Sequence, residues 1–360
     1  MRLSRKVLER SICFVLILGL LAFVGCTPKD GGTSSSGALH LQGAGATFPN
    51  PLYQKWMSEY GKLHPNVKID YQPIGSGGGI KQIQAQTVDF GASDSPMKDE
   101  DLKAAPAELL HIPTVLGAVV LTYNLSGQAQ PLRFSSDVIA DIFLGKITKW
   151  NDARIKTDNP NASLPSTDIV VVHRSDGSGT SAVFTDYLSK ISPEWKTKVG
   201  TGTSPNWPVG VGGKGNDGVT GQVKNTPNTI GYVELAYASQ NKLPVALIKN
   251  RAGEYMAPTL DAVTAAAAES VSNTPADLRV SITDPSGKST YPISSYTYLL
   301  VYKNQKDAAK GKALVDFLWW GVHDGEQFSK PLDYAPLPDE ILKRAEVLIK
   351  TINSGGKPLM

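Results

Sequence analysis

The sequence has few of the residues on which several large protein classes depend. Two cysteines in 360 residues exclude a framework of several disulfides. Charged residues make up 19% of the chain, below the roughly 25% that is usual for soluble domains. The five histidines are scattered without the spacing of a metal site. We therefore expect a globular protein that holds no metal and no cofactor.

The N-terminus predicts export. Residues 2–10 carry four basic side chains and one acidic one, and an apolar run of about 13 residues follows them. That run is too short to span a bilayer, which takes about 20 apolar residues. A basic start, a short apolar stretch and an exit of small residues are typical of a signal peptide, which we place at residues 1–25.

The predicted signal ends at a cysteine. Residues 23–26 resemble the lipobox of bacterial lipoproteins, in which the cysteine becomes the lipidated first residue, although Phe23 stands where leucine is usual. An ordinary signal peptide followed by a chance cysteine is the alternative. Residues 26–39 are rich in glycine and serine, as in a flexible tether. The sequence thus predicts an exported protein anchored through Cys26 to the extracytoplasmic side of a bacterial membrane.

No excess of basic charge remains beyond the signal. After residue 25 the chain carries 32 basic and 32 acidic residues. A nucleic-acid-binding domain normally has a basic excess, so we expect no nucleic-acid partner. An anion bound by this chain must be held by local dipoles and single side chains.

Short apolar stretches alternate with amphipathic ones after the tether, which predicts α/β layers. Apolar residues three to four apart predict helices at 50–63, 80–88, 180–191, 311–322 and 338–352. Apolar runs predict strands at 67–71, 112–123, 168–173, 230–233 and 298–302. Residues 150–166 and 200–228 are rich in proline, asparagine and glycine and are predicted to be surface loops.

Three turns rich in glycine and hydroxyl residues each lead into a predicted helix: Gly43–Pro49, Gly75–Gly79 and Asp176–Ser181. Glycine lets backbone N–H groups approach a ligand, and serine or threonine adds a hydroxyl donor or caps the helix. The first turn of a helix also leaves N–H groups unpaired at the positive end of its dipole. One such turn is most often plain capping, whereas three favour helix N-termini that share one anion.

Two charged residues accompany these turns. Arg174 precedes the third turn, and its guanidinium suits the oxygens of a phosphate or carboxylate, with a surface ion pair to Asp176 as the alternative. Asp94 follows a predicted strand and, taken alone, is most often a turn or cap residue. The spacing around Ser76 and Ser178 fits neither a Walker A loop nor a nucleophile elbow.

Together these segments resemble the phosphate-binding protein of the bacterial phosphate ABC transporter. The likeness adds Val88–Asp94, Leu144–Trp150, Gly212–Gly218 and Ile230–Glu234 to the three turns and covers nearly all of residues 40–360 in order. It implies an α/β, two-lobed periplasmic-binding-protein fold with a two-strand hinge and a ligand cleft between the lobes. The expected lobes are residues 40–118 plus 295–360 and residues 119–294.

The resemblance also implies a site with no catalytic residue. The groups expected to bind phosphate are Thr47, Phe48, Ser76, Asp94, Arg174, Ser178, Gly179 and Thr180. Asp176 matches the acid that braces the arginine. Two positions depart from the family pattern: His173, where a second basic residue is common, and Gly77, where serine is frequent. The expected partners are inorganic phosphate and the permease subunits of an ABC importer, and the expected oligomeric state is a monomer.

We expect Asp94 to select phosphate over sulfate. A carboxylate beside a dianion is repulsive unless a proton lies between them, and near neutral pH phosphate carries a proton whereas sulfate does not.

An extracytoplasmic phosphatase and a phosphate sensor on the same scaffold are the alternative functions. A phosphatase would need a nucleophile–base pair or clustered metal ligands, and neither is visible in the sequence.

Overall fold

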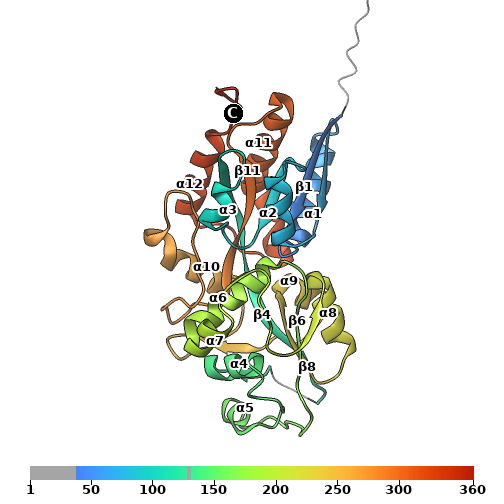
Figure 1. The fold of residues 1–360 in the computed structure, drawn as a ribbon, viewed down its shortest axis with the longest axis vertical. Coiled ribbons are helices and arrows are strands. Elements are labelled where there is room, and N and C mark those ends of the chain that lie inside the picture. The colour runs from blue at the N-terminus through green and yellow to red at the C-terminus, as the bar shows by residue number, and fades with distance from the viewer. Residues whose placement is uncertain (1–37, 128–130) are drawn as a thin grey trace, which may run out of the picture. The chain divides into compact units, whose positions relative to one another are not determined.

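The computed structural model describes residues 38–127 and 131–360, so the predicted signal peptide and Cys26 lie outside the described residues. Helices and strands alternate along this part of the chain (Figure 1). A mixed eight-stranded sheet runs through it in the order β2-β1-β3-β11-β4-β8-β6-β7. The α/β class predicted from the sequence is confirmed.

The large sheet consists of β1 (Leu39–Gly45), β2 (Val67–Gln72), β3 (Phe90–Ser93), β4 (Leu109–Asn124), β6 (Val170–Arg174), β7 (Val211–Gly213), β8 (Thr229–Glu234) and β11 (Ser294–Tyr302). The helices are α1 (Asn50–Leu63), α2 (Ser76–Gln84), α3 (Asp99–Lys103), α4 (Ser136–Phe143), α5 (Ala153–Asp158), α6 (Gly179–Ile191), α7 (Pro193–Lys198), α8 (Gly215–Asn225), α9 (Leu235–Gln240), α10 (Leu260–Ser270), α11 (Ala308–Val322) and α12 (Asp339–Lys350). Smaller sheets are formed by β5 (Arg133–Phe134), β9 (Leu247–Lys249) and β10 (Tyr255–Met256), and by β12 (Asn353–Ser354) and β13 (Lys357–Pro358).

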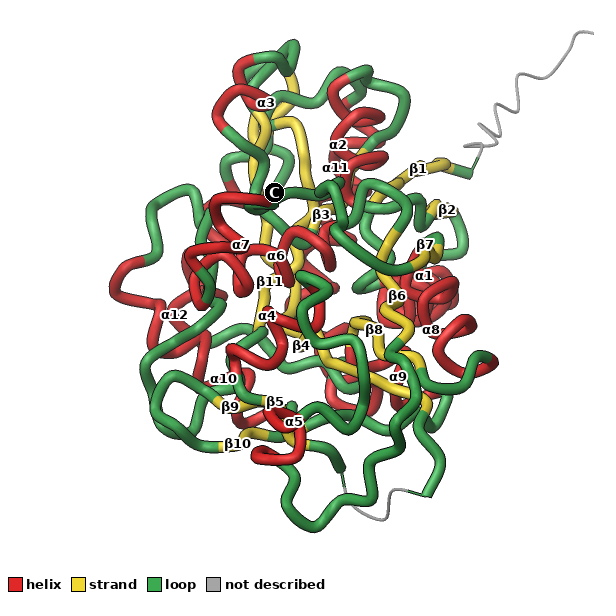
Figure 2. The backbone as a smooth tube through the Cα atoms, turned by 60° about the horizontal axis from the view of Figure 1, so that its bottom comes forward, coloured by secondary structure: helices red, strands yellow, loops and turns green. Residues whose placement is uncertain are grey.

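The long strand β4 joins two lobes. Its residues Leu109–Ala118 pair antiparallel with β11, and Val119–Asn124 pair antiparallel with β8. Figure 2 shows β4 beside β11 at one end and beside β8 at the other. Lobe 1 contains β1, β2, β3 and β11 with α1, α2, α3, α11 and α12, and lobe 2 contains β6, β7 and β8 with helices α4 to α9 (Figure 1). β4 is buried along almost its whole length, which agrees with its mostly apolar sequence.

In lobe 1, the spacing of buried residues in α1 agrees with the spacing of apolar residues from which a helix is predicted. The helix predicted at 50–63 is α1, whose buried residues Leu52, Tyr53, Trp56 and Tyr60 recur every three to four positions. Helix α2 packs against β1 and β3. It ends at Gln84, because the chain turns at Gln86 with a positive φ of 56°, so the predicted extension of this helix to residue 88 is wrong.

Lobe 2 contains ordered elements in both stretches that the sequence predicts to be loops. Helix α5 lies within residues 150–166, and β7 and α8 lie within residues 200–228. Glycine lowers helix propensity, but α8 packs its fully buried Val219 and Val223 against β6 and β8. A Cβ on Gly213 would lie 2.7 Å from the backbone nitrogen of Val219, so glycine permits this close packing. Tertiary packing therefore outweighs the local composition.

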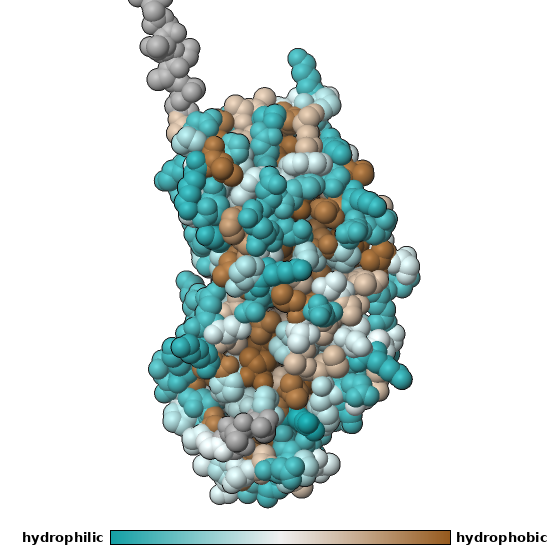
Figure 3. Space-filling model, turned by 180° about the vertical axis from the view of Figure 1, so that it is seen from behind, coloured by the Kyte–Doolittle hydropathy of each residue, from teal (hydrophilic) through white to brown (hydrophobic). Residues whose placement is uncertain are grey.

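The face of the molecule opposite to the one in Figure 1 is mostly hydrophilic. Seen from behind, polar residues cover both lobes and hydrophobic residues form separate patches (Figure 3). The large hydrophobic side chains that are exposed are Leu63, Val211, Val347 and Met360, which lie far apart in the sequence. Within residues 38–127 and 131–360, no helix has both the length and the apolar character needed to span a bilayer.

Candidate functional site

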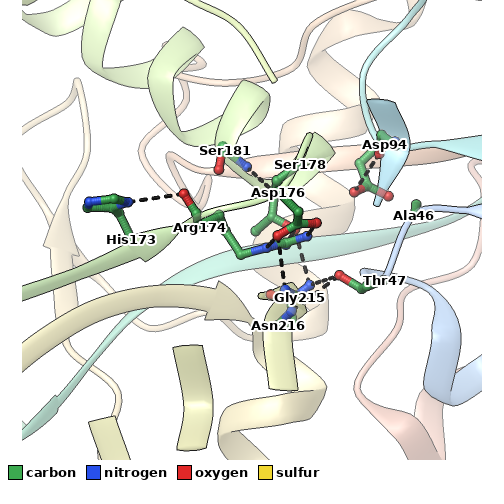
Figure 4. A network of polar contacts seen from close by, with 12 residues as sticks. Ala46, Thr47, Asp94, His173, Arg174, Asp176, Ser178, Ser181, Gly215 and Asn216 are labelled. Atoms are coloured by element: carbon green, nitrogen blue, oxygen red, sulfur yellow. Dashed lines mark hydrogen bonds and ion pairs between the residues drawn. The ribbon is translucent and has the colours of Figure 1, made fainter. Parts of the chain in front are cut away.

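The three glycine-rich turns, distant in the sequence, meet between the lobes. Figure 4 shows Thr47 of the first turn and Ser178 of the third turn near Arg174. The N–H of Gly77 at the start of α2 donates to the carbonyl of Gly177 in lobe 2, with an N···O distance of 2.9 Å. A Cβ placed on Gly179 would lie 2.2 Å from Ser76 Oγ and 2.4 Å from Asp94 Oδ2. The helix starts predicted to share one ligand are therefore adjacent.

Arg174, the last residue of β6, is held by the half-buried carboxylate of Asp176. Its Nε and Nη2 donate to the two oxygens of Asp176 at 2.8 and 2.6 Å, and its Nη1 donates to Thr180 Oγ1 at 3.2 Å. The Arg174 side chain is 1% exposed, so the alternative of a surface ion pair is wrong. A guanidinium has five N–H hydrogens, so Asp176 and Thr180 leave two that can bind an anion.

Asp176 stays charged beside this arginine. Burial raises the pKa of its carboxyl, but the hydrogen bonds and charge of Arg174 outweigh burial, and the pKa lies below its ordinary value. The N–H of Gly215 also donates to Asp176 Oδ1 at 2.9 Å. Asp176 thus fixes the direction of the guanidinium fork and ties it to the start of α8.

Asp94 is a buried acceptor rather than a turn or cap residue. It follows β3, is 1% exposed, and accepts from Thr297 Oγ1 at 2.9 Å and from Ser76 Oγ at 3.4 Å. Burial raises the pKa of its carboxyl to about 7, against the lowering effects of Thr297, Arg174 and Ser76. A ligand that offers a proton therefore suits this position.

The turn before α1 is aimed by two buried tyrosines. The hydroxyl of Tyr237 from lobe 2 donates to the carbonyl of Thr47, and the hydroxyl of Tyr334 donates to the carbonyl of Phe48 at 2.6 Å. In a trans peptide the N–H points opposite to the carbonyl of the preceding residue. The Phe48 N–H is consequently turned away from Tyr237.

The third turn starts α6. Ser178 caps the helix by accepting from the N–H of Ser181 at 3.0 Å, which is the capping alternative for such turns. A hydroxyl that accepts in this way keeps its hydrogen for another acceptor. Ser178 and Thr180 are both 0% exposed, so their hydroxyl groups form hydrogen bonds inside the protein.

Asn216, which starts α8 with Gly215, was not predicted from the sequence. Asn216 Nδ2 donates to Thr47 Oγ1 at 2.9 Å and to Thr180 Oγ1 at 3.2 Å, so it joins the first and third turns. Its segment, Gly212–Gly218, is among those that carry the family resemblance. Because this segment was predicted to be a loop, the fourth helix N-terminus, at Gly215, was not expected.

The two positions that depart from the family pattern, His173 and Gly77, make packing contacts in this structure. His173 points away from Thr47 and Asp94 (Figure 4), and its ring stacks on Trp207 with centroids 5.0 Å apart. A Cβ on Gly77 would lie 3.2 Å from the Cα of Gly177, so glycine permits the close approach of the two turns.

A groove between the lobes adjoins Asp94. This cavity of about 480 Å³ has Gly77, Lys81 and Asp94 of lobe 1 on one side and Ala182 and Asp186 of lobe 2 on the other. Its lining includes Asp94 but not Thr47, Arg174 or Thr180.

The site is therefore rich in hydrogen-bond donors, and the buried carboxylate of Asp94 is placed to accept a hydrogen bond from a protonated ligand. Four helix N-termini and a guanidinium fork favour a small anion. Within the described part of the chain, no group of three or more His, Cys, Asp or Glu side chains is placed to hold a metal ion.

A profile of the PBP superfamily domain matches residues 31–319. This match covers most of the chain and assigns the two-lobed fold to that superfamily. A phosphate-binding protein PstS from Xylella fastidiosa (strain 9a5c) is 46% identical over 310 residues, covering 86% of this chain and 84% of the relative. The chain belongs to the PstS family of phosphate-binding proteins.

Solved structures agree in fold. A phosphate-binding protein from Stenotrophomonas maltophilia has a TM-score of 0.66 at 20% identity, covering 87% of this chain and 94% of its own. An ABC-type phosphate transport receptor from Vibrio cholerae has a TM-score of 0.56 at 16% identity, covering 83% and 100%. At these identities the likeness extends to the fold, and the predicted periplasmic-binding-protein fold is confirmed.

Proposed function

We propose that this protein binds inorganic phosphate between its lobes and delivers it to the permease of an ABC importer. The observation that carries the proposal is the pairing of a donor-rich site with one buried acceptor, Asp94. The proposed ligand groups are Thr47, Phe48, Ser76, Asp94, Arg174, Ser178, Gly179 and Thr180, with Asp176 as the brace of Arg174.

Monoprotonated phosphate matches this pairing chemically. Its unprotonated oxygens accept from the helix N-termini and from Arg174, and its one P–OH donates to Asp94. Sulfate would place only acceptors against Asp94. Sites built around a hydroxyl of the ligand reject the analogue that lacks it by about 10⁴–10⁵.

Titration calorimetry of the purified protein tests the function. We expect tight binding of phosphate, binding of arsenate, which keeps both the proton and the shape, and no measurable binding of sulfate or molybdate at similar concentrations. Micromolar affinity corresponds to about −8 kcal/mol. Failure to bind phosphate, or equal binding of sulfate, would contradict the proposal.

The proposed lobes are residues 40–118 plus 295–360 and residues 119–294, with the hinge where β4 and β11 cross between them. The change of partner in β4 from β11 to β8 at Ala118 and Val119 supports this boundary. Binding between lobes shifts an open–closed equilibrium towards the closed form. The closed form is then the one that the permease recognises.

Closure predicts a steric effect at Gly179. In Gly179→Ala the new Cβ would lie 2.2 Å from Ser76 Oγ and 2.4 Å from Asp94 Oδ2, across the lobe interface. We expect phosphate affinity to fall about 100-fold in calorimetry, because the lobes must stay apart and the hydrogen bonds that span them weaken.

Gly221→Ala is the matched control. Gly221 also lies in a helix of lobe 2, and a Cβ there would meet nothing within 4 Å. Affinity should stay unchanged, and alanine should raise stability slightly, by about 0.5–1 kcal/mol. Wild-type affinity in Gly179→Ala would show that the third turn need not approach Ser76 and Asp94 for binding.

We also propose that the protein is exported as a monomer and anchored by lipid at Cys26. The signal pattern of residues 1–25 supports export, and the cysteine that follows it supports lipid anchoring. Cys26→Ser should move the protein from the membrane fraction to the soluble fraction, measured by blotting of separated fractions. Retention of the variant in the membrane fraction would contradict lipid anchoring.

A further inference from the structure

Asn216 connects the hydroxyls of two proposed ligand residues. It is 0% exposed and lies at the start of α8. Its backbone N–H and its Nδ2 donate to Thr47 Oγ1 at 3.3 and 2.9 Å, and Nδ2 also donates to Thr180 Oγ1 at 3.2 Å. One amide group therefore faces a threonine from each lobe, and Figure 4 shows Asn216 beside Thr47.

The orientation of this amide is fixed. The backbone N–H of Glu234 lies 2.9 Å from Asn216 Oδ1. Since a backbone N–H can only donate, the oxygen of the amide must face Glu234 and the NH₂ group must face the threonines. Glu234 pairs with Val119 of β4, so the group that fixes the amide belongs to the central sheet.

This orientation makes both hydroxyls donors. A hydroxyl has two lone pairs and one hydrogen. Thr180 Oγ1 accepts from Asn216 and from Arg174 Nη1, and Thr47 Oγ1 accepts twice from Asn216. Because all these partners are pure donors, both lone pairs of each hydroxyl are occupied and each hydrogen is available to an acceptor.

We infer that Asn216 is a positioning residue that sets the polarity of the site. It turns the hydroxyls of Thr47 and Thr180 into obligate donors, so the unprotonated oxygens of the ligand face them and the protonated oxygen faces Asp94. The inference rests on the proposed binding of phosphate. It selects the monoprotonated dianion over the doubly protonated monoanion, whose second P–OH would meet hydroxyl hydrogens.

The test compares Asn216→Ala in the wild-type chain and in the Thr47→Val/Thr180→Val background, using calorimetry with inorganic phosphate at pH 8 and pH 5. At pH 8 we expect a loss of affinity of about tenfold in the wild-type chain. In the double-valine background, which has no threonine hydroxyl to orient, the further loss should stay below about threefold. At pH 5 the loss in the wild-type chain should shrink, because the freed lone pairs can accept from a second P–OH.

Asn225→Ala is the control. Asn225 ends the same helix, and its exposed side chain donates to the carbonyl of Gly221. It should leave affinity unchanged. Asn216→Asp is the second variant if alanine impairs folding, which a thermal melt reports. Its carboxylate has the same shape but only accepts, so it should draw both hydroxyls away and weaken binding more than alanine does.

An equal loss from Asn216→Ala in both backgrounds and at both pH values would indicate a purely structural role and overturn the inference. Wild-type affinity in Asn216→Asp would overturn it as well. Absence of phosphate binding by the wild-type chain would instead contradict the proposed function, and it would be seen before any variant is compared.

Discussion

Asp94→Asn is expected to bind sulfate. The wild-type site should reject sulfate by about 10⁴–10⁵, because that ligand leaves the buried carboxylate of Asp94 facing only acceptors. The asparagine amide can donate to an unprotonated oxygen, so the ratio of sulfate to phosphate dissociation constants should fall to about 100 or less. Competition calorimetry with both anions measures this ratio.

The free energy of unfolding, measured as a function of pH, checks whether Asp94→Asn folds like the wild-type protein. Burial raises the pKa of Asp94 from 3.8 to about 7, so the folded protein holds this proton more tightly than the unfolded chain. The charged carboxyl therefore destabilises the unliganded protein increasingly between about pH 4 and pH 7. A shift of about 3 pKa units corresponds to about 4 kcal/mol, so the asparagine variant should gain stability over wild type as pH rises.

Asp284→Asn is the control for this substitution. Asp284 is a half-buried carboxyl whose pKa is also raised by burial, but it lies beside Arg251 and outside the proposed ligand groups. Its variant should reject sulfate as the wild type does. Equally strong rejection of sulfate by Asp94→Asn would refute the role of Asp94 in selectivity.

Arg174→Lys is expected to lose about 10³-fold in phosphate affinity. The two N–H hydrogens that Asp176 and Thr180 leave available on Arg174 form charged hydrogen bonds of about 1.5–3 kcal/mol each with an anion. Lysine keeps the charge, so Asp176 is not left without a cation, but it lacks the planar fork that serves both Asp176 and the ligand. Calorimetry with phosphate measures the loss, and circular dichroism checks the fold.

Arg154→Lys is the matched control, because the chain repeats the geometry there. Arg154 Nε and Nη2 donate to the two oxygens of Asp152 at 3.0 and 2.9 Å, but both residues lie on the surface. An exposed pair contributes about 0–1 kcal/mol, so neither affinity nor stability should change much. If Arg174→Lys kept affinity within about threefold of wild type, the guanidinium fork would not be a ligand group.

Much of the fold could be predicted because its signals are local. The spacing of Leu52, Trp56 and Tyr60 predicts α1, and the long apolar run of 112–123, interrupted by Gly117, predicts β4. The three turns could be found for the same reason, since glycine, a capping hydroxyl and a following apolar stripe are close together in the sequence. Arg174 and Asp176, two residues apart, are also visible locally.

The rest of the site depends on contacts between distant segments. Asp94 meets Thr297, which lies 203 residues further along the chain, and Thr47 meets Tyr237, 190 residues further along. Helix α8 was predicted as a loop because glycine disfavours helix, and only packing against β6 and β8 stabilises it. Asn216 was missed with it.

The sequence by itself predicted the alternation of helices and strands and indicated which residues could bind an anion. Those properties follow from neighbours along the chain. The tertiary structure decided which of these groups are buried, which direction their hydrogens point, and how far the pKa of Asp94 rises. Burial and directed hydrogen bonds depend on atoms from both lobes, which come together only when β4 and β11 bring the two halves of the sheet into contact.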